Sequence, residues 1–215
     1  MVDTKTRTKP LSRDTILDRG QELFAQRGYA GIGIAEVAEG AGLSKSSLFH
    51  HFPSKAHLYT AVMARILTHL DDELTNSLAQ GGRPAERLDR WIDTVVDVLT
   101  ANPTYPGLLL RVLVDDAELP SGLPDGKVAH DTIRRIGANA MRLLREGMDE
   151  AEFRRTSAAY TLQTLFAATV HPLATGRFGD ELIGKPMFSS AEIARRKREV
   201  KAMFHHGLVQ KEARR

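Results

Sequence analysis

The residues best suited to bind a ligand lie within positions 33–55, GIAEVAEGAGLSKSSLFHHFPSK. Ser44 is suited to cap a helix of about two turns, with Leu48 and Phe52 facing inward. Such a helix turns hydroxyls, imidazoles and ammonium groups outward, and these groups suit phosphates and base edges. The residues predicted to bind double-stranded DNA are Ser44, Lys45, Ser46, Ser47, Phe49, His50, His51 and Lys55.

A second helix is predicted just before this one, and the pair has the spacing of a helix-turn-helix. An apolar stripe of helical period runs over residues 34–41 and ends at the turn over residues 42–44. In a helix-turn-helix the second helix enters the major groove, and the residues at its start meet base edges. We therefore expect base contacts from Lys45, Ser46 and Ser47.

Helices are also predicted on both sides of this motif. Ser12 is suited to cap the preceding helix and Gly28 to end it. After the motif, residues 53–55 begin another helix, whose free N-terminal amides and Lys55 suit a phosphate. A helical hairpin rich in Ala, Gly, Ser and Lys also occurs without nucleic acid, and the flanking helices are what favour DNA binding here. The inner face of the preceding helix is predicted to hold Ile16, Leu17, Gly20, Leu23 and Phe24.

Short motifs at fixed spacing run through residues 12–60, and they are Gly28-Tyr29, Val37-Ala38, Ala41-Gly42-Leu43-Ser44, Leu48-Phe49-His50-His51-Phe52, Ser54-Lys55 and Leu58. With these motifs the N-terminal quarter of the chain resembles the DNA-binding region of the TetR family of transcriptional regulators. This resemblance implies an all-α homodimer that binds an inverted-repeat operator, with an N-terminal DNA-binding domain and a C-terminal domain that senses a ligand and dimerises.

Two places depart from the family pattern. Phe49 stands where the family usually has Tyr, whose hydroxyl reaches a phosphate. Ile32 and Gly33 stand where the family usually has Thr at one or both positions, and Gly33 supplies no side-chain oxygen for capping. Both departures remove contacts to phosphate, so we expect them to affect affinity more than base preference.

Composition is that of an ordinary globular chain of 215 residues, with 42% hydrophobic and 27% charged residues and a formal net charge of +3. Residues 1–11 are predicted to form a flexible basic arm, which either follows the DNA backbone or is a solvated tail. The absence of cysteine excludes disulfides and thiolate metal sites and fits a reducing cytoplasm. No run of 18 apolar residues and no signal-peptide core occurs, so we expect neither a membrane span nor export.

The remaining sequence predicts helix after helix, without the alternation typical of strands, so the fold class is expected to be all-α. The expected organisation is a DNA-binding domain over 12–57 and a helical effector-binding and dimerisation domain over 58–215. The predicted helices cover 55–79, 84–101, a short segment from 106, 128–146 closed by Gly147, 149–175, and a last one that begins at Ser189-Ser190 with a capping box to Glu192.

The last two predicted helices carry apolar residues on more than one side, which favours association of two subunits as a four-helix bundle. Burial of all these residues within one subunit is the alternative. The predicted dimer interface contains Phe166, Val170, Val200, Met203 and Phe204.

An effector pocket is expected among the middle helices, and plain core packing is the alternative for each of its members. Because the inner faces lack charged residues, we expect a largely apolar effector. The residues predicted to line this pocket are Trp91, Tyr105, Met141, Phe166 and His171.

Motifs of enzymes, cofactors and metal sites are absent from the sequence. His50-His51 and His205-His206 are adjacent pairs, which point about 100° apart on a helix and do not readily chelate one ion. The leading hypothesis is a repressor that leaves its operator when a small apolar effector binds, with no cofactor, metal or membrane partner. The alternatives are a ligand-independent regulator or activator whose C-terminal domain binds protein and, more remotely, an all-α enzyme.

Overall fold

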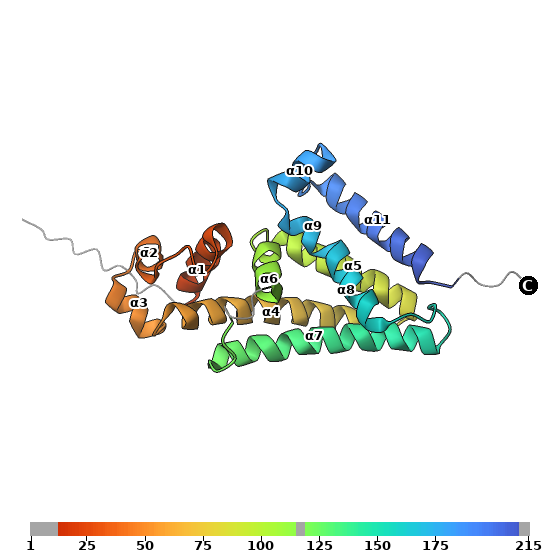
Figure 1. The fold of residues 1–215 in the computed structure, drawn as a ribbon, viewed down its shortest axis with the longest axis horizontal. Coiled ribbons are helices and arrows are strands. Elements are labelled where there is room, and N and C mark those ends of the chain that lie inside the picture. The colour runs from red at the N-terminus through yellow and green to blue at the C-terminus, as the bar shows by residue number, and fades with distance from the viewer. Residues whose placement is uncertain (1–12, 115–118, 211–215) are drawn as a thin grey trace, which may run out of the picture.

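The computed structural model describes residues 13–114 and 119–210. Within these ranges the regular elements are helices, and no strand occurs (Figure 1). Phe153 and Val209 form an isolated antiparallel bridge. The predicted all-α fold is confirmed.

Three short helices form the N-terminal end of the molecule: α1 (Arg13–Arg27), α2 (Ile34–Gly40) and α3 (Lys45–His51). The buried residues of α1 are the five predicted for its inner face. The predicted Ser12 cap and the basic arm lie outside the described residues.

Helix α4 (Lys55–Ala79) is the long axis of the molecule and runs side by side with α7 (Pro124–Asp149) (Figure 1). Its 25 residues correspond to a rod of about 37 Å. Helix α1 packs on the first turns of this rod, while α5, α6 and α7 contact the rest. One unbroken helix therefore joins the N-terminal helices to the larger C-terminal part.

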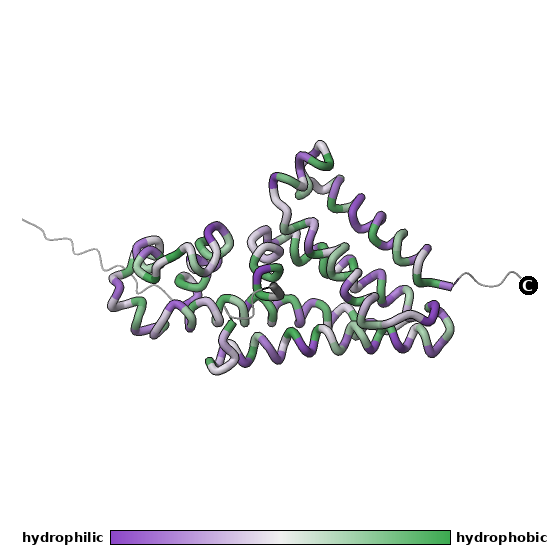
Figure 2. The backbone as a smooth tube through the Cα atoms, in the orientation of Figure 1, coloured by the Kyte–Doolittle hydropathy of each residue, from purple (hydrophilic) through white to green (hydrophobic). Residues whose placement is uncertain are grey.

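The remaining helices surround the C-terminal part of α4. They are α5 (Pro84–Ala101), α6 (Tyr105–Val114), α8 (Ala158–Thr169), α9 (His171–Ala174), α10 (Arg177–Ile183) and α11 (Ser190–Gly207). A continuous hydrophobic core passes from α1 through α4 to α5, α7 and α8. Along α11 hydrophilic and hydrophobic residues alternate in short runs (Figure 2), because one side of this helix packs on α5 and the other faces solvent.

Helix α7 is longer at both ends than the sequence predicts. It begins at Pro124, because proline fits the first helical turn, where its missing N–H is not needed. Gly147, predicted to close the helix, lies inside it, buried against the ring of Phe153.

The helix predicted over 149–175 is wrong in its extent. Residues 150–157 form a non-helical connection, and Ser157 caps α8 by accepting a hydrogen bond from the backbone N–H of Tyr160. Pro172 then separates α8 from the short α9, since proline cannot donate the helical hydrogen bond. Helix α10 is absent from the sequence-based prediction.

The capping box predicted at the start of α11 is also wrong. Ser189 is the N-cap residue, but its side chain makes no capping hydrogen bond. Glu192 is buried instead and pairs with Lys185, with 3.4 Å between Oε1 and Nζ.

A row of two ion pairs and one histidine–carboxylate hydrogen bond joins α5 to α11, and we call it the α5–α11 ladder. Asp89 pairs with His205 (2.8 Å), Asp93 with Lys201 (2.8 Å) and Asp97 with Lys197 (2.5 Å). Each partner set repeats every four residues, so it lies along one face of its helix. The pairing order shows that the two helices run antiparallel.

Candidate nucleic-acid interface

The turn between α2 and α3 is stabilised by backbone geometry and by one serine. Gly42 adopts a φ of 67°, in the left-handed region that favours glycine. Ser44 caps α3: its Oγ accepts from the backbone N–H of Ser47 at 3.1 Å and lies 2.9 Å from the Ser47 Oγ. The predicted cap is confirmed, and it occupies the hydroxyls of both Ser44 and Ser47.

The start of α2 compensates for the missing threonine at position 33. The backbone N–H of Gly33 donates to Glu36 Oε2 at 2.7 Å, and Arg27 donates to Glu36 Oε1 at 2.7 Å. The hydrogen bond from Gly33, followed by the guanidinium of Arg27, lowers the pKa of the Glu36 carboxyl. The glutamate thus satisfies the helix start where a capping side chain is absent.

Helix α3 presents its polar residues away from the protein. Leu48 is fully buried and Phe52 is buried beside it. The exposed residues of this segment are Ser44, Lys45, Ser46, Ser47, Phe49, His50 and His51. This arrangement places the predicted DNA-binding side chains of α3 together on one outward surface.

The outward surface of α3 carries basic and neutral polar groups and no carboxylate. The Lys45 ammonium lies 5.8 Å from the centre of the Phe49 ring. The rings of His50 and His51 meet edge to face, with centroids 5.9 Å apart. Such a surface suits the negative potential of a nucleic acid.

Lys55 has a role inside the subunit that the sequence did not reveal. Its Nζ donates to the backbone oxygens of Tyr29 (2.8 Å) and Ile32 (3.0 Å), and it lies 4.2 Å from the centre of the Tyr29 ring. The side chain is half-buried. Lys55 therefore holds the α1–α2 connection against the start of α4, and two of its three donors are not available to a phosphate.

Comparison with families of known proteins finds a match in the N-terminal helices and the first part of α4. Residues 16–62 match the family model described as bacterial regulatory proteins, tetR family. These residues are similar to the DNA-binding region of that family, and they include α2, α3 and the start of α4.

Two mycobacterial relatives illustrate this similarity. The uncharacterized HTH-type transcriptional regulator Rv1255c of Mycobacterium tuberculosis is 38% identical over 97 residues, which cover 45% of this chain and 48% of the relative. The HTH-type transcriptional repressor KstR of Mycolicibacterium smegmatis is 28% identical over 102 residues, covering 47% and 50%. The chain thus spans about half the length of the curated relatives it matches.

Solved structures resemble the whole fold described above. The ketosteroid transcriptional regulator KstR2 of Mycobacterium tuberculosis superimposes with a TM-score of 0.75 at 18% identity, covering 98% of both chains. AibR, solved with isovaleryl coenzyme A and operator DNA, gives 0.74 at 14% identity and covers 89% of this chain and 96% of its own. These likenesses concern the fold.

A polar junction connects the TetR-type N-terminal helices to α4 and α6. Arg65 on α4 donates to Asp18 (2.7 Å) and Gln21 (2.8 Å) on α1, and Gln21 donates to Thr104 at the start of α6 (2.8 Å). The guanidinium of Arg111 on α6 lies against Gly28, so a Cβ at this position would require the arginine side chain to move. Helix α6 therefore contacts the N-terminal helices directly.

The five predicted pocket residues differ in how deeply they are buried. Trp91 and Tyr105 are buried in the core, Met141 and Phe166 are half-buried, and His171 is exposed. The Tyr105 hydroxyl lies 3.2 Å from His69 Nδ1, and burial raises its pKa. The exposed His171 does not fit an interior pocket of one subunit, and for the other four the assignment stays a prediction.

Three of the five predicted interface residues are internal. Val170, Val200 and Phe204 are buried within the subunit, so they contribute to its own core. Phe166 is half-buried, and Met203 is 65% exposed. For these three the interface assignment stays a prediction, because the face of each helix that packs inward is as apolar as the face expected to meet a partner.

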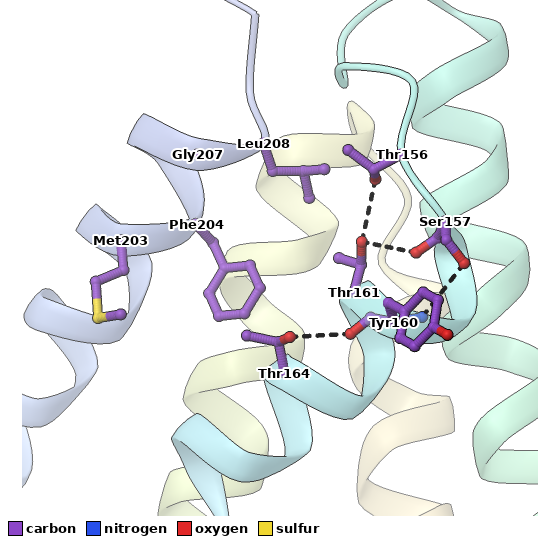
Figure 3. A pocket seen from close by; sticks show the side chains of 9 residues that line it. All are labelled: Thr156, Ser157, Tyr160, Thr161, Thr164, Met203, Phe204, Gly207 and Leu208. Atoms are coloured by element: carbon purple, nitrogen blue, oxygen red, sulfur yellow. Dashed lines mark hydrogen bonds between the residues drawn. The ribbon is translucent and has the colours of Figure 1, made fainter.

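A surface hollow of about 370 Å³ lies between α8 and α11 (Figure 3). Its walls combine hydroxyl and apolar side chains, and the Thr161 and Thr164 hydroxyls donate to backbone oxygens within α8. A second hollow of about 560 Å³ lies between α9, α10 and α11, lined by residues that include Pro172, Leu182 and Met203. Neither hollow is lined by any of the predicted pocket residues.

Within residues 13–114 and 119–210, no cluster of three or more His, Asp or Glu side chains suits a metal ion. Across the same ranges, no helix has the length and apolar character needed to cross a bilayer.

Proposed function

We propose that this protein is a homodimeric, DNA-binding transcriptional regulator of the TetR family, and that it is a repressor released by a largely apolar effector. Each subunit contributes one α3 helix to the major groove of an inverted repeat. The proposed DNA-binding region covers residues 12–57, and the remainder from 58 senses the effector and dimerises.

The outward surface of α3 is the observation that carries this proposal. A helix anchored by the fully buried Leu48 presents Lys45, Ser46, His50 and His51 to solvent, with no acidic side chain among them. A surface helix ordinarily turns a polar face to solvent, and this one is distinguished by carrying basic groups without any carboxylate. A major groove lined by phosphates and base acceptors complements this surface.

The dimer follows from the size of α3 and from the exposed apolar residues at the opposite end. A seven-residue helix is too small an interface for specific binding at physiological salt, so two helices about 34 Å apart are needed. Four of the six exposed large hydrophobic side chains of the described residues lie on α8, α10 and α11: Tyr160, Phe178, Leu182 and Met203. Such a gathering marks an interaction surface, and we assign it to the second subunit.

Effector release requires the C-terminal part to act on α3, and the polar junction supplies a route. Helix α6 contacts α1 through Thr104 and Arg111, while Arg65 fixes α1 to α4. An effector that shifts α6 against α4 therefore displaces the N-terminal helices and changes the separation of the two α3 helices.

The test of DNA binding is a selection from duplexes with a randomised 30-base-pair centre. We expect the purified protein to enrich an inverted repeat whose half-sites lie about one helical turn apart, and to shift it as a dimer. The affinity for the selected duplex falls steeply as salt rises, because phosphate contacts release counterions.

A matched pair of variants assigns this activity to α3. Ser46→Glu places a carboxylate on the outward surface near a helix start, and we expect a loss of more than about a hundredfold in affinity. Ser190→Glu makes the same change at the exposed start of α11 and leaves DNA binding unchanged. If both variants bind the selected duplex as the wild type does, α3 is not the DNA-binding element.

Effector release is tested on the preformed complex with the selected duplex. Apolar fatty acyl and steroid compounds are titrated in, and fluorescence anisotropy reports release of labelled DNA. Dissociation at a saturable concentration supports a ligand-released repressor. A complex that resists every such compound favours the ligand-independent regulator.

A further inference from the structure

The residues of α3 differ in how far they point from the protein core. Successive residues of a helix are rotated by about 100°, so residues two positions from Leu48 point almost directly away from it. Those residues are Ser46 and His50, which lie four apart and therefore form one stripe along the helix. We call these two residues the outer stripe.

The flanking side chains are already engaged within the protein. On one flank the Lys45 ammonium lies over the Phe49 ring at 5.8 Å. On the other flank the Ser47 hydroxyl is 2.9 Å from the hydroxyl of the capping Ser44. His50 is exposed, and its described contact is the edge-to-face meeting with the His51 ring.

Positive and neutral groups dominate the surroundings of His50. On α3 itself the other charged or titratable side chains are Lys45 and His51. On α2, which packs against α3, Glu36 is held by Gly33 and Arg27, and Glu39 is exposed. At the start of α4, Lys55 and His57 are bonded to Tyr29, Ile32 and Ser54, and Arg13 of α1 lies over the Phe52 ring.

We infer that His50 is the base-reading residue of the outer stripe and that it reads guanine in its protonated form. This inference rests on the proposed DNA binding and extends it to sequence preference. A protonated imidazole has two N–H donors and no acceptor. Guanine presents two acceptors, N7 and O6, in the major groove, whereas adenine presents one acceptor and one donor there.

This chemistry makes base preference depend on pH. Only the protonated imidazole offers both donors to guanine, and the phosphates of a bound duplex attract its positive charge. Discrimination for guanine is therefore full on the acidic side of neutrality and falls as the pH rises through the range in which histidine loses its charge.

The experiment compares two duplexes that differ at one position per half-site. A selection from the randomised library at about pH 6 identifies the position, and guanine is then replaced there by adenine. We expect the affinity ratio of the guanine to the adenine duplex to be about tenfold or more near pH 6, and about threefold or less near pH 8. Contacts to phosphate affect both duplexes alike and cancel in this ratio.

Two glutamine variants assign the effect to one imidazole. His50→Gln is expected to prefer adenine, because an amide pairs with adenine N6 and N7, and its ratio does not change with pH. His51→Gln weakens both duplexes alike and keeps the pH-dependent preference for guanine. Circular dichroism and light scattering verify that each variant is folded and dimeric.

The outcomes separate this inference from the proposed function. If His50→Gln still selects guanine at the same position, or if the wild-type ratio is equal at both pH values, His50 does not read guanine as a cation. If the wild type selects no sequence at either pH, the proposed DNA binding itself fails.

Discussion

Helices α3 and α11 both pack one side on the subunit and turn the other to solvent, yet only in α3 does the sequence identify the inner side. In α3 the residue that packs inward is Leu48, and the opposite side is polar. In α11 the buried Val200 and Phe204 are accompanied by the exposed Met203. A single apolar stripe identifies the inner face of a helix, whereas two apolar stripes leave the choice between core and partner to the rest of the fold.

The largest expected effect comes from two neighbouring residues of α11. Phe204→Ala removes a buried ring that packs on the core, and we expect it to cost about 3–5 kcal/mol of unfolding free energy. Met203→Asp changes the adjacent exposed residue, and we expect little change in that free energy but loss of the dimer. Urea unfolding and light scattering measure the two quantities.

These two variants test whether the buried and exposed sides of α11 have the different roles assigned to them. A Met203→Asp protein that stays dimeric and binds DNA would remove the exposed side of α11 from the interface. A Phe204→Ala protein as stable as the wild type would mean that the ring contributes nothing to the subunit core.

Lys55 tests the same distinction at the N-terminal end. Lys55→Met removes the donor for the backbone oxygens of Tyr29 and Ile32, and we expect the free energy of unfolding to fall by about 1–3 kcal/mol. Because we expect Lys55 to act as an internal clamp, the slope of log affinity against log salt should stay the same. If Lys55 instead neutralises a phosphate, the substitution would lower the magnitude of that slope by about 0.9 for each phosphate released.

A smaller effect is expected from the departure at position 49. Phe49→Tyr adds a hydroxyl to a ring that is 36% exposed on the outward surface of α3. One hydrogen bond to a phosphate would tighten DNA binding by about 1 kcal/mol, measured by anisotropy at constant salt. An unchanged affinity in a folded dimer would place the ring edge away from the DNA backbone.

The smallest expected effect is that of Glu36 on the stability of the protein at acidic pH. The backbone N–H of Gly33 and then Arg27 lower the pKa of this carboxyl, so the folded state favours its ionised form. Its contribution to stability is present above the ordinary carboxyl pKa and is lost as the pH falls through the lowered value. The free energy of unfolding, measured across that range, should depend less steeply on pH in Glu36→Gln than in the wild type. Equal slopes for the two proteins would contradict this role of Glu36.

Most of the N-terminal end was predictable because its signals are local. Ser44 caps α3, the glycine turn at 42 separates the two helices, and the inner face of α1 follows a simple helical period. Each of these features depends on residues within a few positions of one another. The surface of α3 follows from them, since burial of Leu48 alone orients the helix.

In the C-terminal part the predictions were wrong where residues distant in the sequence determine the local structure. Gly147 continues α7 because Phe153 packs against it, and Glu192 turns from the start of α11 to Lys185. The spacing of four among Asp89, Asp93 and Asp97, matched by Lys197, Lys201 and His205, was a signal for the α5–α11 ladder. Solvated helix faces carry the same spacing, so only the structure shows that these two sets pair.

The α5–α11 ladder also affects the order in which parts of the protein fold during synthesis. Asp93 and Lys201 are 108 positions apart, so the basic partners leave the ribosome roughly 5–20 s after the acidic ones. During that interval the N-terminal helices have all their residues, while the acidic stripe of α5 still lacks its partner. A nascent subunit therefore completes its DNA-binding end well before the surface proposed for pairing with a second subunit exists.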